Sequence, residues 1–99
     1  MMTSEQFTRI AKALADPRRF EILEMIAAAE EVACKAMVEA FPVAQATISH
    51  HLKELATAGL IEARREGQHG HYRVREGVLD QYMAELARRL RTEAPAVAR

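Results

Sequence analysis

The hydrophobic pattern of this sequence changes its period at Gly59. Before that glycine, apolar residues recur at the spacing of helices, whereas residues 60–65 and 71–75 alternate along the chain. The segment between them, 67–70, has glycine at both ends and predicts the tip of a β-hairpin. Helical spacing returns at 78–90. We therefore expect a helical domain that carries one small hairpin.

Capping residues and apolar spacing predict five helices in total. Thr3 and Gln6 fit a capping box at the start of a first helix, and Asp16 followed by Pro17 fits the start of a second. The other helices are expected at 34–41, at 45–58 and at 78–90. The predicted fold is mainly α with a small β-hairpin, in the order four helices, two strands and a last helix.

The length of 99 residues leaves room for one domain, so we expect a single domain over 1–99, with residues 93–99 as a flexible tail. An apolar share of 49% with 28% charged residues excludes a disordered chain. One cysteine excludes an intramolecular disulfide, and no apolar run is long enough to span a membrane. The first residues lack the layout of a signal peptide, so a cytoplasmic protein without a membrane partner is expected.

Catalytic patterns are missing from the sequence. No Ser-His-Asp, Cys-His or paired-carboxylate arrangement falls at a recognisable spacing, and no glycine-rich phosphate loop is present. We therefore expect no enzyme, no catalytic residue and no cofactor.

The pattern in the middle of the chain predicts a winged helix-turn-helix. Two helices joined at 41–44 precede a basic hairpin; in this fold one helix fills the DNA major groove and the hairpin lies along the flanking backbone or minor groove. Helical geometry gathers four residues on one side of 45–57, namely Ile48, His51, Leu52 and Leu55. The opposite side carries Ala46, Ser49, His50, Lys53 and Thr57, with Gln45 at the N-terminal end. One side is expected to pack and the other to contact DNA.

The net charge is zero, which by itself argues against a nucleic-acid binder. The charges are unevenly distributed, however, because residues 43–75 hold five bases, three acids and all four histidines. We expect double-stranded DNA to contact a recognition helix at 45–58 and a wing at 61–75. The candidate contacts are Gln45, Ala46, Thr47, Ser49, His50, Lys53, Arg64, Arg65, Gln68 and Arg73. Gln, Ser and His suit base edges, whereas Lys and Arg suit phosphates.

Residues 10–90 resemble the ArsR family of bacterial winged-helix transcriptional repressors. The resemblance lies in LADPRR at 14–19, ATISHHLKEL at 46–55, AGLI at 58–61 and RREG at 64–67. It implies a homodimer formed by the first and last helices, with two recognition helices on a palindromic operator. The apolar stripes of these two helices suit that role. The expected interface residues are Phe7, Ile10, Leu14, Leu79, Tyr82, Met83, Leu86 and Leu90.

Departures from the family pattern argue against a metal sensor. Metal-sensing members carry a Cys-x-Cys pair whose positions fall here on Ala33 and Lys35, with Cys34 between them. A second family metal site uses Asp and His on the last helix, where this chain has Asp80 but no histidine. A single thiol does not supply the three or four ligands of a zinc site, so no metal site is expected. Family members also often have Ser at the cap position occupied here by Ala44.

Two alternative functions remain open from the sequence. The same surface suits a winged-helix module that binds an acidic protein partner. Cys34 beside Lys35 also suits a thiol-based, redox-sensing repressor, although cysteines without a partner are mostly small core residues. The sequence identifies neither the effector nor the operator.

Overall fold

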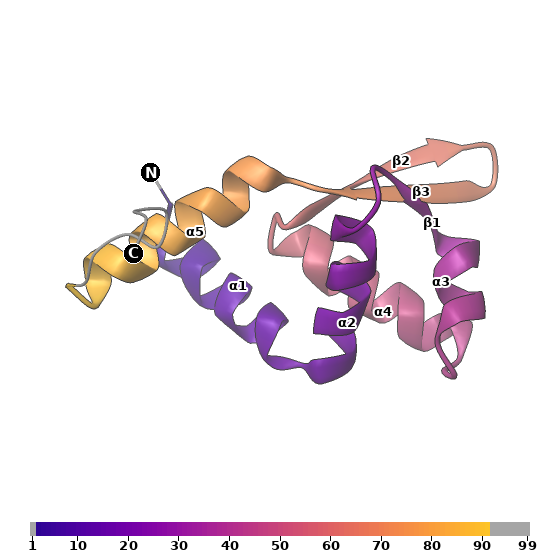
Figure 1. Ribbon diagram of the computed structural model, residues 1–99, viewed down its shortest axis with the longest axis horizontal. Coiled ribbons are helices and arrows are strands. Elements are labelled where there is room, and N and C mark those ends of the chain that lie inside the picture. Colours follow the sequence, from indigo (N-terminus) through magenta and orange to yellow (C-terminus); the bar gives the residue numbers. More distant parts are fainter. Residues whose placement is uncertain (1, 92–99) are drawn as a thin grey trace.

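The computed structural model describes residues 2–91, so the expected tail at 93–99 lies outside the described residues. The described residues form five helices and three strands, and Figure 1 shows them arranged in an elongated molecule. They are α1 (Ser4–Ala15), α2 (Pro17–Ala27), β1 (Val32–Ala33), α3 (Cys34–Ala40), α4 (Gln45–Thr57), β2 (Ile61–Glu66), β3 (His69–Val74) and α5 (Glu76–Arg89). The predicted helices and hairpin are confirmed, and the predicted ends of α3 and α4 are each one residue too late.

The side chains of Thr3 and Asp16 cap α1 and α2, as predicted. The hydroxyl of Thr3 accepts a hydrogen bond from the backbone N–H of Gln6 at 3.1 Å, and the carboxylate of Asp16 accepts one from Arg19 at 2.9 Å. The Gln6 side chain does not return to Thr3, as a full capping box would require. Its amide instead donates to the carbonyl oxygen of Ala58 at 3.4 Å, which ties α1 to the end of α4.

The hairpin is part of a three-stranded antiparallel sheet in the order β1-β3-β2. Strand β1 pairs Val32 with Tyr72, and the sequence analysis missed it because two residues show no alternation. The hairpin turn holds only Gly67 and Gln68, with Gly67 at φ 63°, so the expected four-residue tip is wrong. A two-residue turn needs this positive φ, which glycine adopts without strain, and β3 therefore begins at His69.

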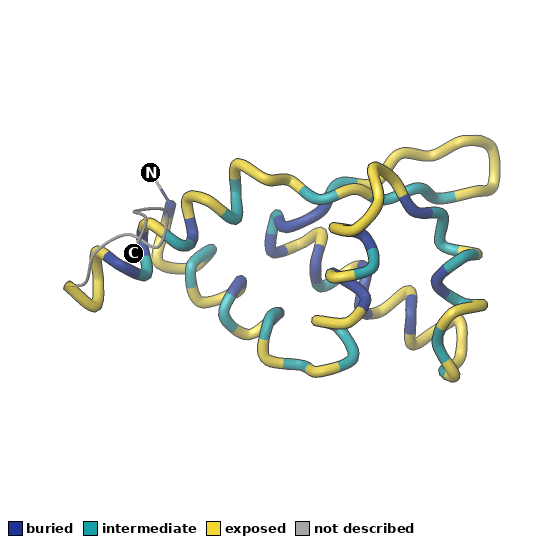
Figure 2. Tube along the Cα trace, in the orientation of Figure 1, coloured by how far each residue is buried: buried dark blue, intermediate teal, exposed yellow. Residues whose placement is uncertain are grey.

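The hydrophobic core lies where α1, α2, α4 and the base of the hairpin meet. Figure 2 shows buried residues on the inner sides of α2 and α4 and at the start of β2, whereas the far end of the hairpin is exposed. The fully buried large side chains are Ile10, Ile22, Ile26, Met37, Ile48, Leu52, Leu55, Leu60 and Ile61. This core holds α4 beneath the sheet. None of the described helices is long and apolar enough to cross a membrane.

Helices α1 and α5 pack against each other at the end of the molecule away from the hairpin tip (Figure 1). Phe7 of α1 lies on Tyr82 of α5, with ring centroids 5.1 Å apart. The guanidinium of Arg89 lies 4.2 Å from the Phe7 ring centroid and donates to the Ser4 hydroxyl at 2.9 Å. Arg89 also binds the carboxylate of Glu85 at 2.7 Å, so one α5 side chain joins both helices.

Two of the expected dimer residues instead face the interior of the protomer. Ile10 has no exposed surface and Tyr82 only 9%, so these two side chains pack within the protomer and present little surface to a partner. Ile10 belongs to the apolar stripe of α1 and Tyr82 to that of α5, and both side chains pack into the core of the protomer. Half-buried or exposed positions remain on the same stripes, namely Phe7, Leu14, Leu79, Met83, Leu86 and Leu90.

Candidate nucleic-acid interface

Helix α4 has one buried and one exposed side, as its periodicity predicts. Ile48, His51, Leu52 and Leu55 are buried against the core. The candidate contacts on the helix are all exposed, namely Gln45, Ala46, Thr47, Ser49, His50 and Lys53. Small and polar side chains on this side leave the backbone of α4 close to the surface, as a helix that enters the major groove requires.

The two ends of α4 are held in different ways. Ala44 has no side-chain oxygen to cap the helix, and only its carbonyl takes part, accepting from Thr47 and Ile48 at 3.0 and 3.2 Å. At the other end Gly59 adopts φ 85°, and the N–H of Leu60 returns to the carbonyl of Leu55 at 3.0 Å. The prediction that Gly59 ends this helix is confirmed.

His51 lies on the buried side of α4 and links this helix to α2. The guanidinium of Arg19 donates to Nδ1 of His51 at 3.3 Å, and His51 is only 7% exposed. Burial lowers the pKa of His51 although the nearby Asp16 carboxylate opposes this shift. The neutral imidazole is therefore the acceptor in this bond, and His51 serves packing, as its position on the helix predicted.

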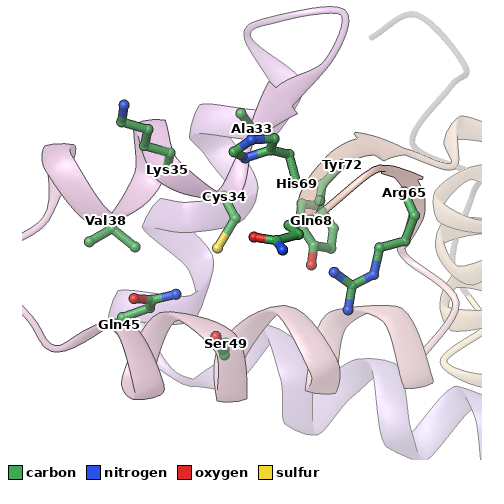
Figure 3. A pocket seen from close by; sticks show the side chains of 11 residues that line it. Ala33, Cys34, Lys35, Val38, Gln45, Ser49, Arg65, Gln68, His69 and Tyr72 are labelled. Atoms are coloured by element: carbon green, nitrogen blue, oxygen red, sulfur yellow. The ribbon is translucent and has the colours of Figure 1, made fainter.

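A cavity of about 350 Å³ lies between α3, α4 and the hairpin (Figure 3). It brings four of the candidate DNA contacts together, because Gln45 and Ser49 of α4 line it together with Arg65 and Gln68 of the hairpin. The remaining lining residues are Ala33, Cys34, Lys35, Val38, His69, Gly70 and Tyr72. The lining includes two basic side chains and no carboxylate, which gives this concave surface a charge suited to an anion.

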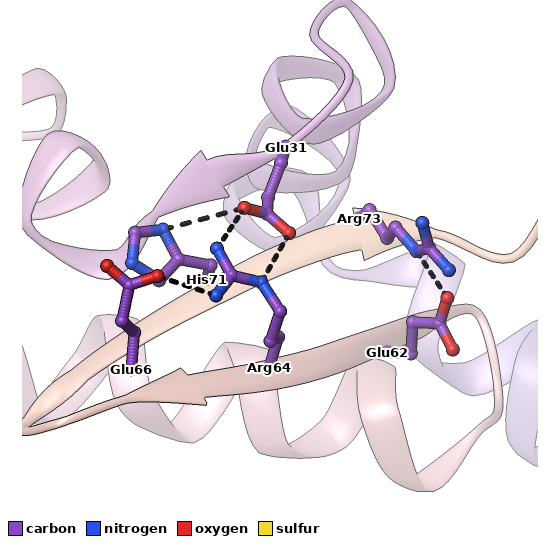
Figure 4. Close-up of polar contacts among 6 residues, drawn as sticks. All are labelled: Glu31, Glu62, Arg64, Glu66, His71 and Arg73. Atoms are coloured by element: carbon purple, nitrogen blue, oxygen red, sulfur yellow. Dashed lines mark hydrogen bonds and ion pairs between the residues drawn. The ribbon is translucent and has the colours of Figure 1, made fainter.

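The other two candidate arginines of the wing, Arg64 and Arg73, lie in ion pairs on the opposite side of the hairpin (Figure 4). Arg64 binds Glu31 through two nitrogens, at 2.7 and 3.2 Å, and Glu66 through a third at 2.8 Å. Arg73 pairs with Glu62 on the neighbouring strand. The hydrogen bonds from Arg64 lower the pKa of both Glu31 and Glu66, so these carboxylates stay charged around it at neutral pH. Sequence reasoning did not single out Glu31, which precedes the unpredicted β1.

The residues at the family's metal positions do not form a metal site. Ala33 occupies the N-cap position of α3 without a side-chain cap, and Lys35 is exposed on the first turn. In the part of the chain that the structure describes, no three His, Cys, Asp or Glu side chains gather to hold an ion. Cys34 is half-buried and lines the cavity beside α4.

Comparisons with known proteins agree with this geometry. Residues 14–64, which run from the end of α1 to the middle of β2, match the helix-turn-helix domain family. The arsenical resistance operon repressor of Staphylococcus aureus is 33% identical over 85 residues, covering 86% of this chain and 81% of the relative. An HTH-type transcriptional regulator of Mycobacterium tuberculosis is 41% identical over 70 residues, or 71% of this chain and 30% of that protein.

Solved structures of related proteins share the whole fold. An ArsR-like transcriptional regulator from Rhodococcus sp. RHA1 has a TM-score of 0.75 at 27% identity, covering 87% of this chain and 79% of that one. A homodimeric winged helix-turn-helix DNA-binding domain from Mycobacterium bovis has a TM-score of 0.69 at 36% identity, over 88% and 79% of the two chains. The chain therefore belongs to the ArsR family of winged helix-turn-helix transcriptional regulators.

Proposed function

We propose that this protein is a transcriptional repressor that binds a palindromic operator as a homodimer, with α4 of each protomer in a major groove. The observation that carries the proposal is the continuous surface from the exposed side of α4 into the cavity below Arg65. It joins small and polar groups that suit base edges to a concave wall with two cations and no carboxylate. Relatives that are named operon repressors support repression rather than activation of transcription. We expect the protein to act in the cytoplasm, where operator DNA is accessible.

The proposed dimer is formed by the outer sides of α1 and α5. Leu90 at the end of α5 is 67% exposed and, with Phe20 of α2, is one of two exposed large apolar side chains among residues 2–91. Leu79, Met83 and Leu86 lie half-buried along α5, and Leu14 lies half-buried on α1. A two-fold axis through this end places two copies of α4 on one duplex, and the Mycobacterium bovis relative is described as homodimeric.

The proposal assigns base reading and phosphate binding to different side chains. Gln45, Ser49 and His50 lie on the exposed side of α4 and carry hydrogen-bonding groups that distinguish base edges. Lys53 on α4 and Arg65 on the wing carry charges that suit phosphates, which strengthen binding to every sequence.

Binding measurements on variants test this assignment. A duplex is first selected from a random-sequence pool with the wild-type protein, and a scrambled duplex of equal length serves as reference. Ser49→Ala and Gln45→Ala are each expected to cost about 1–3 kcal/mol on the selected duplex and much less on the scrambled one. Gln81→Ala, on the exposed side of α5, is the matched control and should leave both affinities unchanged. Equal losses on both duplexes for Ser49→Ala would contradict base reading by α4.

A further inference from the structure

The strand pairing divides the hairpin into two faces with different charges. Residues directly opposite each other in an antiparallel pair point to the same face of the sheet, and neighbours along a strand point to opposite faces. The outer face holds Glu62, Arg64 and Glu66 of β2 opposite Arg73, His71 and His69 of β3. The inner face holds Ala63 and Arg65 opposite Tyr72 and Gly70. Arg64 and Arg65 are therefore neighbours in sequence whose side chains lie on opposite faces of the sheet.

The outer face is closed to phosphate by its own carboxylates. Three nitrogens of Arg64 already donate to Glu31 and Glu66, and Arg73 and Arg75 both pair with Glu62. Three carboxylates, of Glu31, Glu62 and Glu66, balance the three arginines Arg64, Arg73 and Arg75 around this face, so its ion pairs leave no net positive charge to attract a phosphate. Glu31 belongs to the segment before β1 rather than to the hairpin, and Figure 4 shows its side chain reaching across to Arg64.

The inner face is open to phosphate. Among residues 2–91, no carboxylate lies within ion-pair distance of Arg65. Figure 3 shows the Arg65 guanidinium directed toward α4, in the cavity that Gln45 and Ser49 also line. Arg65 thus lies next to the groups that the proposed function assigns to base reading.

We infer that Arg65 contacts the DNA backbone, whereas Arg64 is a positioning residue whose bridge to Glu31 anchors the wing to the body of the protomer. This inference rests on the proposed function and refines it, because composition and spacing alone treat Arg64, Arg65 and Arg73 alike. The bridge joins β2 to the segment before β1, which sets the angle at which the hairpin projects past α4. The pairing of β1 with β3 also holds the hairpin against the protomer, so Arg65 keeps its phosphate contact when the bridge alone is lost.

The salt dependence of binding separates the two roles. Each phosphate contact releases counterions, so its loss lowers the slope of log affinity against log salt by about one. Arg65→Ala is expected to lower the slope by about one per protomer and to weaken binding about tenfold per protomer near 0.1 M salt. Arg64→Ala is the matched control one residue away, and it should leave the slope unchanged with only a few-fold loss of affinity. The probes are the selected and scrambled duplexes described above.

A charge exchange tests the anchor itself. Arg64→Glu alone places three carboxylates together and is expected to weaken binding strongly. Adding Glu31→Arg restores an ion pair of reversed polarity, and the double variant should return to within a few-fold of wild-type affinity with the wild-type slope. Circular dichroism of each variant checks that the protomer remains folded.

The outcomes distinguish this inference from the function on which it rests. Equal slope losses for Arg64→Ala and Arg65→Ala, or an unchanged slope for Arg65→Ala, would overturn the division of roles while leaving DNA binding intact. A double variant that binds no better than Arg64→Glu would overturn the anchor. A wild-type protein that shows no binding to any selected duplex would overturn the proposed function and the inference together.

Discussion

Gly59 determines where the recognition helix ends, and its conformation is unsuited to any other residue. At φ 85° a side chain is strained, and a Cβ at this position would lie 2.9 Å from the amide nitrogen of Gln6. Gln6 is the residue that binds the carbonyl of Ala58, so a clash here also disturbs the link between α1 and α4.

Gly59→Ala is therefore expected to lower the free energy of unfolding by about 1–2 kcal/mol, the cost of the left-handed conformation for an L-residue. Gly77→Ala is the control, because Gly77 lies in α5 with open space around its Cβ position. That substitution should stabilise the protein by about 0.4–1 kcal/mol. Urea denaturation measures both, and equal effects of the two substitutions would contradict the account of Gly59.

The buried His51 makes stability depend on pH. Its pKa in the folded protein lies below the ordinary value because of burial, and Arg18, Arg19 and His50 add positive charge around it while Asp16 opposes them. Below about pH 6.5 the unfolded state binds the proton first, so stability is highest above this pH and falls as the pH drops toward the folded pKa.

Unfolding free energies measured between about pH 8 and pH 5 test this prediction. The wild type should lose stability over this range, and His51→Asn, which keeps a hydrogen-bond acceptor but does not titrate, should lose less. His50→Asn is the control, because His50 is exposed on the same helix, and its curve should follow the wild type. Parallel curves for His51→Asn and the wild type would show that another group causes the loss.

At the scale of elements, α4 begins without a side-chain cap, as α3 and α5 also do. Asp16 and Thr3 cap α2 and α1 with side-chain oxygens, whereas Ala44 offers none. Ala44→Ser should supply a hydroxyl to the first free N–H groups of α4 and raise the free energy of unfolding by about 1 kcal/mol.

The same variant separates stability from recognition. Because the cap lies outside the exposed side of α4, the ratio of affinities for the selected and scrambled duplexes should stay as in the wild type. A changed ratio in a titration of both duplexes would show that the start of α4 takes part in reading the sequence.

The elements differ in how far the sequence could predict them. The sides of α4 follow from spacing alone, since Ile48 and Leu55 must share a side of any helix that contains them both. Strand β1 could not be predicted, because Val32 pairs with Tyr72 far along the chain and nothing local marks that partner.

The candidate site residues could also be predicted only in part. Alternation places Arg64 and Arg65 on opposite faces, but only the packing of the sheet above α4 decides which of them faces the cavity. Ile10 likewise shares its apolar stripe with Phe7 and Leu14, and a stripe does not reveal which members close the core and which remain at the surface. Periodicity defines faces, whereas tertiary packing assigns them.

At the scale of the whole molecule, dimerisation should depend on the end formed by α1 and α5. Leu90→Glu places a charge at a position that is 67% exposed in the protomer, so the protomer should fold while the dimer weakens. Gln81→Glu adds the same charge at an exposed α5 position away from the apolar stripe. Sedimentation velocity at micromolar concentration should show dissociation for the first variant alone. A dimer that tolerates Leu90→Glu would place the interface elsewhere.

DNA binding by the whole protein is expected to be independent of metal. The family's cysteine positions hold Ala33 and Lys35, and among residues 2–91 no cluster of three ligands gathers. Zinc, cadmium or arsenite titrated into the protein–duplex complex should change the affinity by less than a few-fold. Release of DNA at stoichiometric metal would reveal a site that forms only in the complex or the dimer.

The stoichiometry and specificity of DNA binding by the wild-type protein show whether paired α4 helices read an operator. Sedimentation velocity with a labelled palindromic duplex, selected as described above, gives the number of chains per duplex, and a fluorescence titration against the scrambled duplex gives the preference. Paired α4 helices on one operator should give two chains on one palindrome and a preference of about 10³-fold or more. One chain per duplex, or equal affinity for both sequences, would show that paired α4 helices do not read an operator.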